Sequence, residues 1–416
     1  MFATFAQLFK PKNRDIQKKI LFTLGALFIF KLGTAITVPG VNLDTKNLGF
    51  LDIVNAMSGG AFEKASIFAL GVMPYITASI VIQLLSMDII PYLSDLRNQG
   101  GVGRNKLNQI TRITGIILAF FQGYLYSFAY IKNGSAIDYM TYSMVLTAGT
   151  CLLLWIGDQV TAKGIGNGIS LIIMAGIITT LPSMFVNLWN ELIGGDNGFL
   201  GLLTFILFVA SFIAIIVGVI YTECAERRLP IQYANKSTMS GNQNYIPFKL
   251  NSSGVMPVIF ASAPLSIIQI VAKVVNNSKF SLFVTKYLSY EKPVGLLIYV
   301  ILIILFAYFY TFMQMKPSEI SDNLNKNGGY ILGVRPGKET TDYITKVLNR
   351  ITFVGAILLA ILASLPILIS KFTSINTSIS ISGTGLLIVV GVALETCKQL
   401  EGELVSRTYQ KGRRGR

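Results

Sequence analysis

The side chains that could do chemistry in this chain of 416 residues are few, and their spacing supports no catalytic or metal site. There is no histidine, which is the commonest general base and metal ligand in proteins. The three cysteines, Cys151, Cys224 and Cys397, are odd in number and far apart, so they predict neither a zinc site nor a disulfide framework. We therefore expect a protein that is not an enzyme and that uses no metal and no cofactor.

Ionisable side chains inside the apolar segments are also rare. Lys31 lies in the middle of one such segment, and Asp158 and Glu395 lie near the ends of two others. An ion-coupled transporter needs carboxylates near the bilayer midplane, and an intramembrane protease needs a nucleophile with a base, so neither class is favoured. A charge at the bilayer centre costs more than about 2.5 kcal/mol, so we expect Lys31 to pair within the protein or to reach the membrane surface.

One apolar stretch carries uncharged polar residues that a lipid-facing helix does not need. Residues 61–91 are predicted to form one helix, with Thr77, Ser79 and Gln83 set into it and Pro74 in its first turns. Polar or irregular elements at membrane depth are tolerated where they face protein or water. The stretch therefore predicts a helix that lines a passage.

Aliphatic residues stand beside glycine or proline in four apolar segments, and pairs four residues apart share one helix face. Isoleucine on a membrane helix ordinarily faces lipid or packs against a neighbour. The alternative is a ring of apolar side chains that constricts a water-filled passage. The residues concerned are Val72, Ile76, Ile169, Ile173, Ile259 and Ile388.

The composition identifies the elements that must position these residues. Hydrophobic residues make up 52% of the chain and charged residues 13%, and the apolar runs are about 20 residues long, enough to cross a bilayer as helix. We expect an all-α membrane protein with ten transmembrane helices. The predicted spans are 19–38, 67–87, 112–131, 142–160, 168–188, 200–221, 254–272, 293–315, 348–370 and 382–398.

The basic residues fix the predicted orientation. With the N-terminus inside, 26 of the 35 Lys and Arg residues fall in inner segments and 8 in outer ones. Positive loops remain in the cytosol, so both termini are predicted to be cytosolic. Two sets of five spans insert with opposite topology, which indicates inverted, pseudo-symmetric halves with a pathway between them. We expect a cytosolic segment at 1–18, halves at 19–190 and 191–398, and a basic cytosolic tail at 399–416. The last residues of this tail, 411–416, are expected to be flexible.

Two long inner loops, at about 222–253 and 316–347, carry arginines next to proline. Arg227 and Arg228 precede Pro230, and Arg335 begins an Arg–Pro–Gly turn that leads to Lys338. Basic loops often act only as topology signals. Stiff turns that present arginines also suit an anionic partner such as ribosomal RNA, or a cytosolic motor protein.

A shorter segment, 49–66, is too polar to cross lipid yet carries apolar residues. It is predicted to be a re-entrant half-helix that enters the membrane from one side and stops. Its candidate residues are Phe50, Ile53, Val54, Met57, Ser58, Gly59 and Gly60.

Long ordered stretches resemble the SecY family, the central subunits of the bacterial protein-conducting channel, along nearly the whole chain. They are ITVPGVN at 36–42, SGGAFEKASIFALGVMPYITASIVIQLLSMDIIP at 58–91, GGVGRNKLNQITR at 100–112, KGIGNGISLIIMAGI at 163–177, ERRLPIQYANK at 226–236, YIPFKLNSSGVMPVIFASAPL at 245–265, NLNKNGGYILGVRPGKETTDYI at 323–344 and SGTGLLIVVGVALE at 382–395.

The resemblance implies a clamshell of two halves hinged between the fifth and sixth spans. It implies that the six aliphatic residues form the pore ring, that 49–66 is the plug, and that spans two, three, seven and eight form a lateral gate to lipid. Thr77, Ser79 and Gln83 would lie on that gate. It also implies docking of SecA or the ribosome on Arg227, Arg228, Arg335 and Lys338, small partner subunits SecE and SecG, and signal sequences and nascent chains as clients.

Some positions depart from the family pattern. Ser382 stands where a glycine is usual, and the loop at 103–106 reads Gly–Arg–Asn–Lys where consecutive basic residues are common. These differences leave open a specialised accessory SecY with restricted clients. A small-solute secondary transporter and a purely structural membrane scaffold are two further hypotheses.

Overall fold

The structure, a computed structural model, describes residues 14–39, 55, 58–87, 89–131, 134–193, 198–233, 245–274, 278–288, 292–373 and 377–414. The fold is helical, and a helix lies in each of the ten predicted spans. The elements are α2 (Arg14–Gly33), α4 (Met73–Leu85), α5 (Pro91–Asn98), α6 (Gly101–Tyr130), α7 (Ala136–Lys163), α8 (Gly168–Ile193), α9 (Gly198–Cys224), β1 (Glu226–Tyr233), β2 (Tyr245–Lys249), α10 (Met256–Val274), α11 (Ser278–Phe283), η4 (Val284–Leu288), α12 (Pro293–Gln314), α13 (Pro317–Lys326), β3 (Gly329–Ile331), α14 (Lys338–Thr373) and α15 (Thr377–Arg414).

Among the described residues, length and hydropathy alone mark five helical stretches as able to cross a membrane. They are Ala136–Lys163, Gly168–Ile193, Gly201–Cys224, Pro293–Lys326 and Lys338–Ile369. Two shorter apolar helices, Met73–Leu85 and Met256–Gln269, lie in the predicted second and seventh spans. Both of these belong to the region that carries the candidate pore residues.

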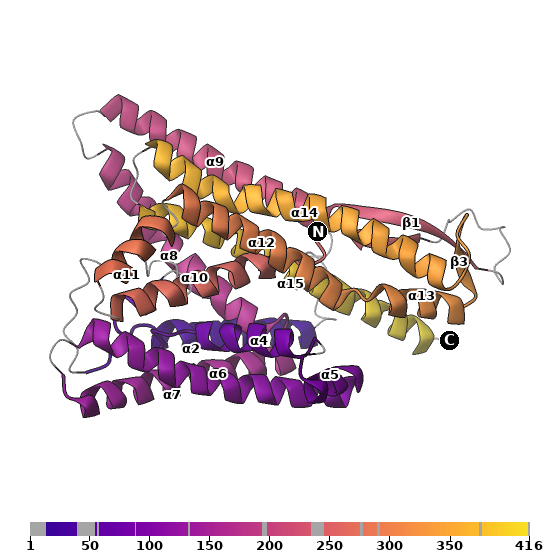
Figure 1. The fold of residues 1–416 in the computed structure, drawn as a ribbon, viewed down its shortest axis with the longest axis horizontal. Coiled ribbons are helices and arrows are strands. Elements are labelled where there is room, and N and C mark those ends of the chain that lie inside the picture. Colours follow the sequence, from indigo (N-terminus) through magenta and orange to yellow (C-terminus); the bar gives the residue numbers. More distant parts are fainter. Residues whose placement is uncertain are drawn as a thin grey trace.

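The helices form layers that follow the order of the chain. In Figure 1 the helices α2, α4, α6 and α7 make the lower layer, and α9, α12 and α14 lie above them. The helices up to α8 meet the helices from α9 onward along two seams. The first, here called the hinge seam, is formed by α8 against α9 and α15, and the second, here called the gate seam, by α4 and α6 against α10. The predicted boundary at residue 190 falls in the last turns of α8 and stays a prediction.

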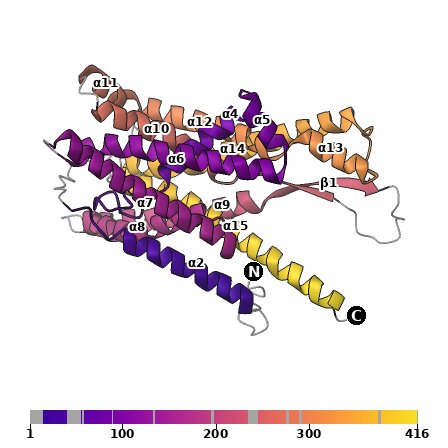
Figure 2. The ribbon, with the colours of Figure 1, turned by 90° about the horizontal axis from the view of Figure 1, so that it is seen from below.

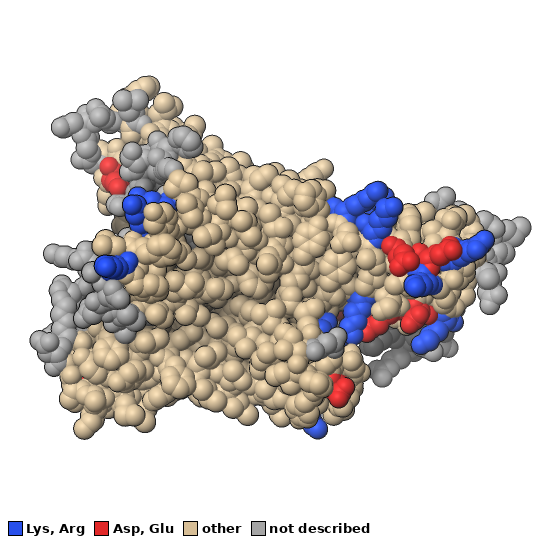
Figure 3. Space-filling model, in the orientation of Figure 1, with Lys and Arg blue, Asp and Glu red and all other residues tan. Residues whose placement is uncertain are grey.

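Charged side chains lie at the ends of the molecule. Figure 3 shows them gathered mostly at the end that carries the strands, with a wide band free of Lys, Arg, Asp and Glu between the two ends on this face. Large apolar side chains such as Leu24, Leu203 and Leu305 are exposed on the helices of this band. An exposed apolar belt of this kind is the surface that lipid covers.

A small antiparallel sheet projects beyond the helices at one end (Figures 1 and 2). Its strand order is β2-β1-β3. Leu229 and Ile231 of β1 face inward and pack in a cluster with Ile344 and Leu348 of α14. The sequence prediction described this region only as loops with stiff turns, although Leu229 and Ile231 alternate with polar neighbours as a half-buried strand requires.

The predicted helix at 61–91 begins later than expected. Residues 58–72 form a series of buried turns, and α4 starts only at Met73. Gly59, Gly60 and Gly71 have positive φ angles, which a continuing helix cannot accommodate. The backbone groups of this segment instead pair with the chain that leaves α2, since Val38 N–H donates to the Ala65 carbonyl and Ile67 N–H to the Ile36 carbonyl.

The end of the predicted tail, 411–416, also differs in its described residues from the expectation that it is flexible. Helix α15 continues without interruption to Arg414. Leu404 is buried in a small cluster with Ile16 of α2 and Ile165 of the α7–α8 connection. One turn away, the Lys19 ammonium donates to the Glu403 carboxylate at 2.8 Å. Apolar burial together with an ion pair explains why this stretch is an ordered helix.

Candidate functional site

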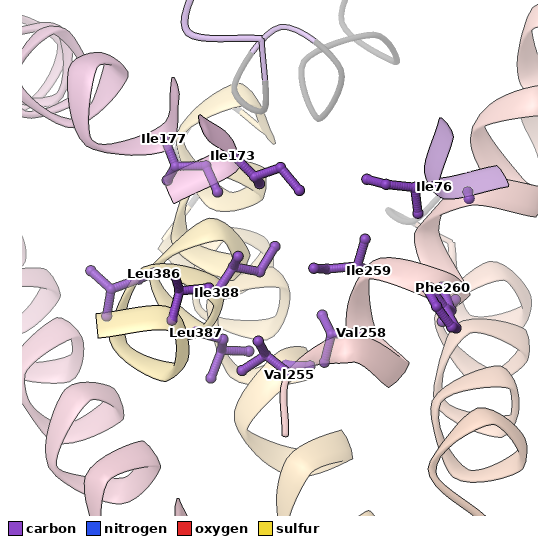
Figure 4. Packing of buried hydrophobic residues seen from close by; sticks show 14 of the residues in the cluster. Ile76, Ile173, Ile177, Val255, Val258, Ile259, Phe260, Leu386, Leu387 and Ile388 are labelled. Atoms are coloured by element: carbon purple, nitrogen blue, oxygen red, sulfur yellow. The ribbon is translucent and has the colours of Figure 1, made fainter. Parts of the chain in front are cut away.

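The candidate site is an apolar constriction to which four distant helices each contribute a side chain. Ile76 of α4, Ile173 of α8, Ile259 of α10 and Ile388 of α15 are all buried and belong to one hydrophobic cluster. In Figure 4, Ile76 and Ile173 point toward one another from opposite sides, and Ile259 and Ile388 do the same just beside them. The structure therefore brings four of the six predicted ring residues around one space.

The two remaining ring residues lie at the margin of this cluster. Val72 is buried in it, directly before the first turn of α4. Ile169 is only partly buried, and its side chain lies against Gly157 of α7. Ile169 is thus the least enclosed of the six, because it stands in the first turn of α8, where the helix still contacts α7.

Apolar neighbours extend the constriction along its axis. Val255 and Val258 lie on the same side as Ile259 in Figure 4, and Leu387 lies below Ile388. Phe260 points the other way. It packs edge-on against Phe306 and Tyr310 of α12, which fixes the rotation of α10 and so aims Ile259 into the centre.

Glycines on α15 allow the helices to approach closely enough to form the ring. A methyl carbon added to Gly385 would lie 2.8 Å from the side chain of Ile177 on α8. A methyl carbon added to Gly391 would collide with the side chain of Val255, just before α10. No side chain fits at either contact without displacing a neighbour, so the ring depends on glycine on both sides of Ile388.

Part of the predicted plug seats against the helix that carries Ile173. A methyl carbon added to Gly59 would lie 3.1 Å from Gly176 Cα and from Thr179 Oγ1 of α8. Lys31 pairs within the protein, since its ammonium donates to the Gly59 carbonyl at 3.4 Å. Ser58 and Gly60 flank this contact. The predicted plug residues Phe50, Ile53, Val54 and Met57 lie outside the described residues.

The predicted gate residues form hydrogen bonds along their own helix. Thr77 donates to the Met73 carbonyl at 3.1 Å, and the Gln83 amide donates to Ser79 Oγ at 3.0 Å. The Gln83 carbonyl oxygen is buried and finds no partner among the described residues. All three side chains are half-buried on α4, whose gate-seam neighbour is α10. Among the described residues, none of these three side chains has a hydrogen-bond partner on α10.

The turn that carries Arg335 is held rigidly. Gly333 and Gly337 have φ angles of 79° and 103°, which glycine alone adopts readily. Buried Thr340 donates to the Arg335 carbonyl at 2.8 Å, and Ser321 donates to the Gly337 carbonyl at 3.2 Å. The Arg335 side chain is exposed, and so is Lys338 at the start of α14. The turn thus presents its charge from a fixed backbone.

The predicted basic pair of the other loop is split between two faces of a strand. Arg227 and Arg228 are neighbours on β1, so their side chains point to opposite sides. Arg228 lies on the outer face, where it donates to Glu226 at 2.8 Å and sits 4.7 Å from the centre of the Tyr245 ring. The hydrogen bond with Glu226 raises the pKa of the Arg228 guanidinium, which is exposed.

A buried polar network at the base of the β1–β2 hairpin was missed from the sequence. Asn251 donates to the Glu223 carboxylate at 2.7 Å and to the Gly254 carbonyl at 2.8 Å. Lys398 of α15 donates to the Glu223 carbonyl at 3.0 Å. The network ties both stems of the hairpin to α15, directly before α10 begins. A glutamate at the end of an apolar span was the available signal.

The described residues hold no group of three or more Cys, Asp and Glu side chains that could bind a metal ion. The geometry is that of a seal between aliphatic side chains.

Comparison with known proteins agrees with this geometry. The SecY family model matches residues 66–397. The protein translocase subunit SecY of Staphylococcus carnosus is 45% identical over the full length of both chains. The solved structure of a protein-conducting channel superimposes with a TM-score of 0.68 at 20% identity, covering 94% of this chain and 93% of that one. Canine Sec61 in a ribosome–channel complex from the endoplasmic reticulum gives 0.64 at 19% identity, with coverage of 94% and 93%. The chain described above therefore belongs to the SecY family.

Proposed function

We propose that this chain is the pore subunit of a protein translocase in a bacterial plasma membrane. Unfolded secretory polypeptides cross the membrane through it, and apolar segments leave it sideways into lipid. The observation that carries the proposal is the constriction, where Ile76, Ile173, Ile259 and Ile388 converge from four helices inside an apolar belt. The family to which the chain belongs supports the same function.

The apolar character of the ring accounts for both sealing and passage. A narrow aliphatic constriction sheds water when it is empty, so ions meet a barrier there. A polypeptide in transit fills the space, and the side chains close around it. Because aliphatic groups make no sequence-specific hydrogen bonds, the ring accepts clients of any sequence. No catalytic group is needed, and the energy comes from partners.

The other predicted elements extend this function. Ser58–Gly60 contacts α8 only one turn from Ile173, which suits the end of a plug that rests on the constriction. The gate seam between α4, α6 and α10 is the exit toward lipid, and the half-buried polar side chains of α4 lie beside it. A client that parts this seam reaches the bilayer without leaving the channel.

The cytosolic partners are proposed from the shape and charge of the loops. The rigid Arg335 turn and the fixed Arg228 side chain suit an anionic or protein surface, namely ribosomal RNA or the ATPase SecA. The canine relative was solved bound to a ribosome. SecE and SecG are proposed as the small membrane subunits, and both chain termini are proposed to be cytosolic.

Site-specific photocrosslinking tests the pore. A crosslinking amino acid at Ile76 or Ile259 should capture a stalled secretory nascent chain, and the same group at lipid-exposed Leu203 of α9 should not. Equal capture at all three positions would contradict the pore assignment. Saturable uptake of a small solute by vesicles that pass no polypeptide would favour a transporter, and binding of SecA or ribosomes without passage would favour a scaffold.

A charge reversal tests the docking turn. Arg335→Glu should abolish SecA-driven export, because it places a negative charge on the rigid turn while the protein remains inserted. Lys326→Glu is the matched control, since Lys326 is an exposed residue of the same loop at the end of α13. Normal ATP-driven export by the Arg335 variant would refute the docking role. Export of only a few substrates by the unaltered protein would favour an accessory SecY.

A further inference from the structure

One polar contact crosses the gate seam at its cytosolic end. The Arg97 guanidinium, on the last turn of α5, donates through Nη2 to the Met313 carbonyl on the last turn of α12, at 3.1 Å. These residues are 216 positions apart in the chain. Helix α5 follows the gate helix α4, and α12 packs against α10, so the contact joins the two sides of the seam.

The Met313 carbonyl needs a donor from outside its own helix. In a continuing helix it would accept from the N–H of the residue four positions later. That residue is Pro317, which has no N–H. Arg97 supplies the missing donor and places a positive charge at the negative end of the α12 dipole. Arg97 is half-buried, so water replaces this bond poorly while the seam is closed.

Helix α5 is fixed firmly enough to transmit this contact. Leu93 and Leu96 anchor one face of the helix in the protein. A methyl carbon added to Gly103 would collide with the Leu96 carbonyl oxygen, so the start of α6 abuts the end of α5 directly. A force that pulls α12 away from Arg97 therefore acts on α6 and, through it, on α4.

A second, weaker set of polar groups lies around this contact. Lys316 donates to the Asn98 amide oxygen at 3.5 Å and to the Glu319 carboxylate at 2.8 Å. Arg97 and Arg104 both attract the Glu319 carboxylate electrostatically. Both of the hydrogen bonds from Lys316 are exposed to solvent and contribute little individually. Their arrangement nevertheless places Arg97, before α6, and Arg104, in the first turn of α6, opposite an anion after α12.

We infer that Arg97 is a positioning residue of the lateral gate, which holds the cytosolic end of the gate seam closed and so sets how strong a signal segment must be to open it. The inference rests on the proposed function. An incoming apolar segment must separate α5 from α12, and the Met313 carbonyl then loses its donor. Removal of one such charge-assisted bond should shift the closed-to-open ratio by about tenfold.

The test measures the seam directly and then its consequence. Spin labels at exposed Asp95 and Ser318, in a full-length chain whose three cysteines are serine, report the distance between α5 and α13. Arg97→Met keeps the length of the side chain but removes the donor, and Arg97→Lys keeps a donor and the charge. Glu403→Gln is the control, because it breaks the Lys19–Glu403 ion pair between α2 and α15, away from the gate seam.

We expect Arg97→Met to lengthen the label distance and to raise translocation of a client with a weakened signal sequence by about tenfold. For Arg97→Lys, the label distance and the translocation should lie between those of Arg97→Met and those of the unaltered chain. For Glu403→Gln, both should match the unaltered chain. An unchanged distance together with unchanged signal stringency in Arg97→Met would overturn the inference. If the unaltered protein passes no client at all, the proposed function fails, yet the label distance still decides whether Arg97 holds the seam.

Discussion

The two seams between the helix layers are built in different ways. At the hinge seam the Ile177 side chain of α8 packs so closely on Gly385 of α15 that no further side chain fits between them. The C-terminal part of α15 adds the buried cluster around Leu404 and the Lys19–Glu403 pair with α2. At the gate seam, α4 and α6 meet α10, and the Arg97–Met313 hydrogen bond joins α5 to α12 at one end of the seam.

Under the proposed function, this difference predicts where the molecule opens. Separating two helices that pack this closely loses packing along the whole interface at once. Breaking a hydrogen bond at a cytosolic rim costs far less, because water takes over the freed groups once they separate. The hinge seam can therefore stay intact while the gate seam parts. The isoleucine ring lies between the two and takes residues from both sides.

The largest effect is expected from filling the hinge seam. Gly385→Leu would force an isobutyl group into the space held by Ile177 and should lower the free energy of unfolding by about 3 kcal/mol. The thermal unfolding midpoint in detergent measures it. Gly402→Leu is the control in the same helix, since nothing lies within 4 Å of a methyl carbon added there. Equal midpoints for the two variants would show that the hinge seam is not closely packed.

The next effect concerns the ring. Ile76→Asn and Ile173→Asn place an amide among aliphatic side chains, which costs about 2 kcal/mol in the dry, closed state and favours the wet, open one. Ion conductance of reconstituted vesicles should rise, and clients with poor signal sequences should pass. Ile178→Asn, at an exposed position of the same helix as Ile173, should do neither. Unchanged conductance and stringency in both ring variants would refute the seal.

A smaller effect is expected where the predicted plug meets the hinge-seam helix. Gly59→Ala strains a backbone with φ of 73° and pushes against Gly176, so the closed position should weaken by roughly 1–2 kcal/mol. Gly60→Ala has the same backbone strain, at φ of 80°, but nothing lies within 4 Å of the added carbon. Resting ion leak should therefore be greater for Gly59→Ala. An equal leak would assign the effect to backbone strain and remove the contact with α8 from the explanation.

The smallest effect is expected at the cytosolic end of the hinge seam. Glu403→Gln removes an ion pair whose side chains are 33% and 28% exposed, so it should cost less than about 1 kcal/mol and should matter less at high salt. Leu404→Ala removes buried apolar area at the next residue, and its larger cost should not depend on salt. Thermal unfolding at two salt concentrations distinguishes the effect of Glu403→Gln from that of Leu404→Ala. A salt-independent loss for Glu403→Gln would contradict the surface character of the pair.

Local physical rules allowed parts of this structure to be predicted from the sequence. The lengths of the apolar runs predicted where helices lie, because crossing a bilayer requires about 20 apolar residues. The family pattern identified Ile76, Ile173, Ile259 and Ile388, which the structure brings together. The beginning of α4 was predicted too early, because hydropathy does not show that Gly71 has a positive φ. The sheet was missed because β1 carries arginine and proline and because its partners β2 and β3 are short.

The sequence by itself determined that this chain is a helical membrane protein of the SecY family, which residues could line its constriction, and that its loops are basic. Composition, span length and motif order carry that information locally along the chain. Only the tertiary structure decided that Arg97 reaches Met313 and that Asn251 meets Glu223. Such contacts depend on the packing of elements that lie far apart in the chain, and no local pattern specifies that packing.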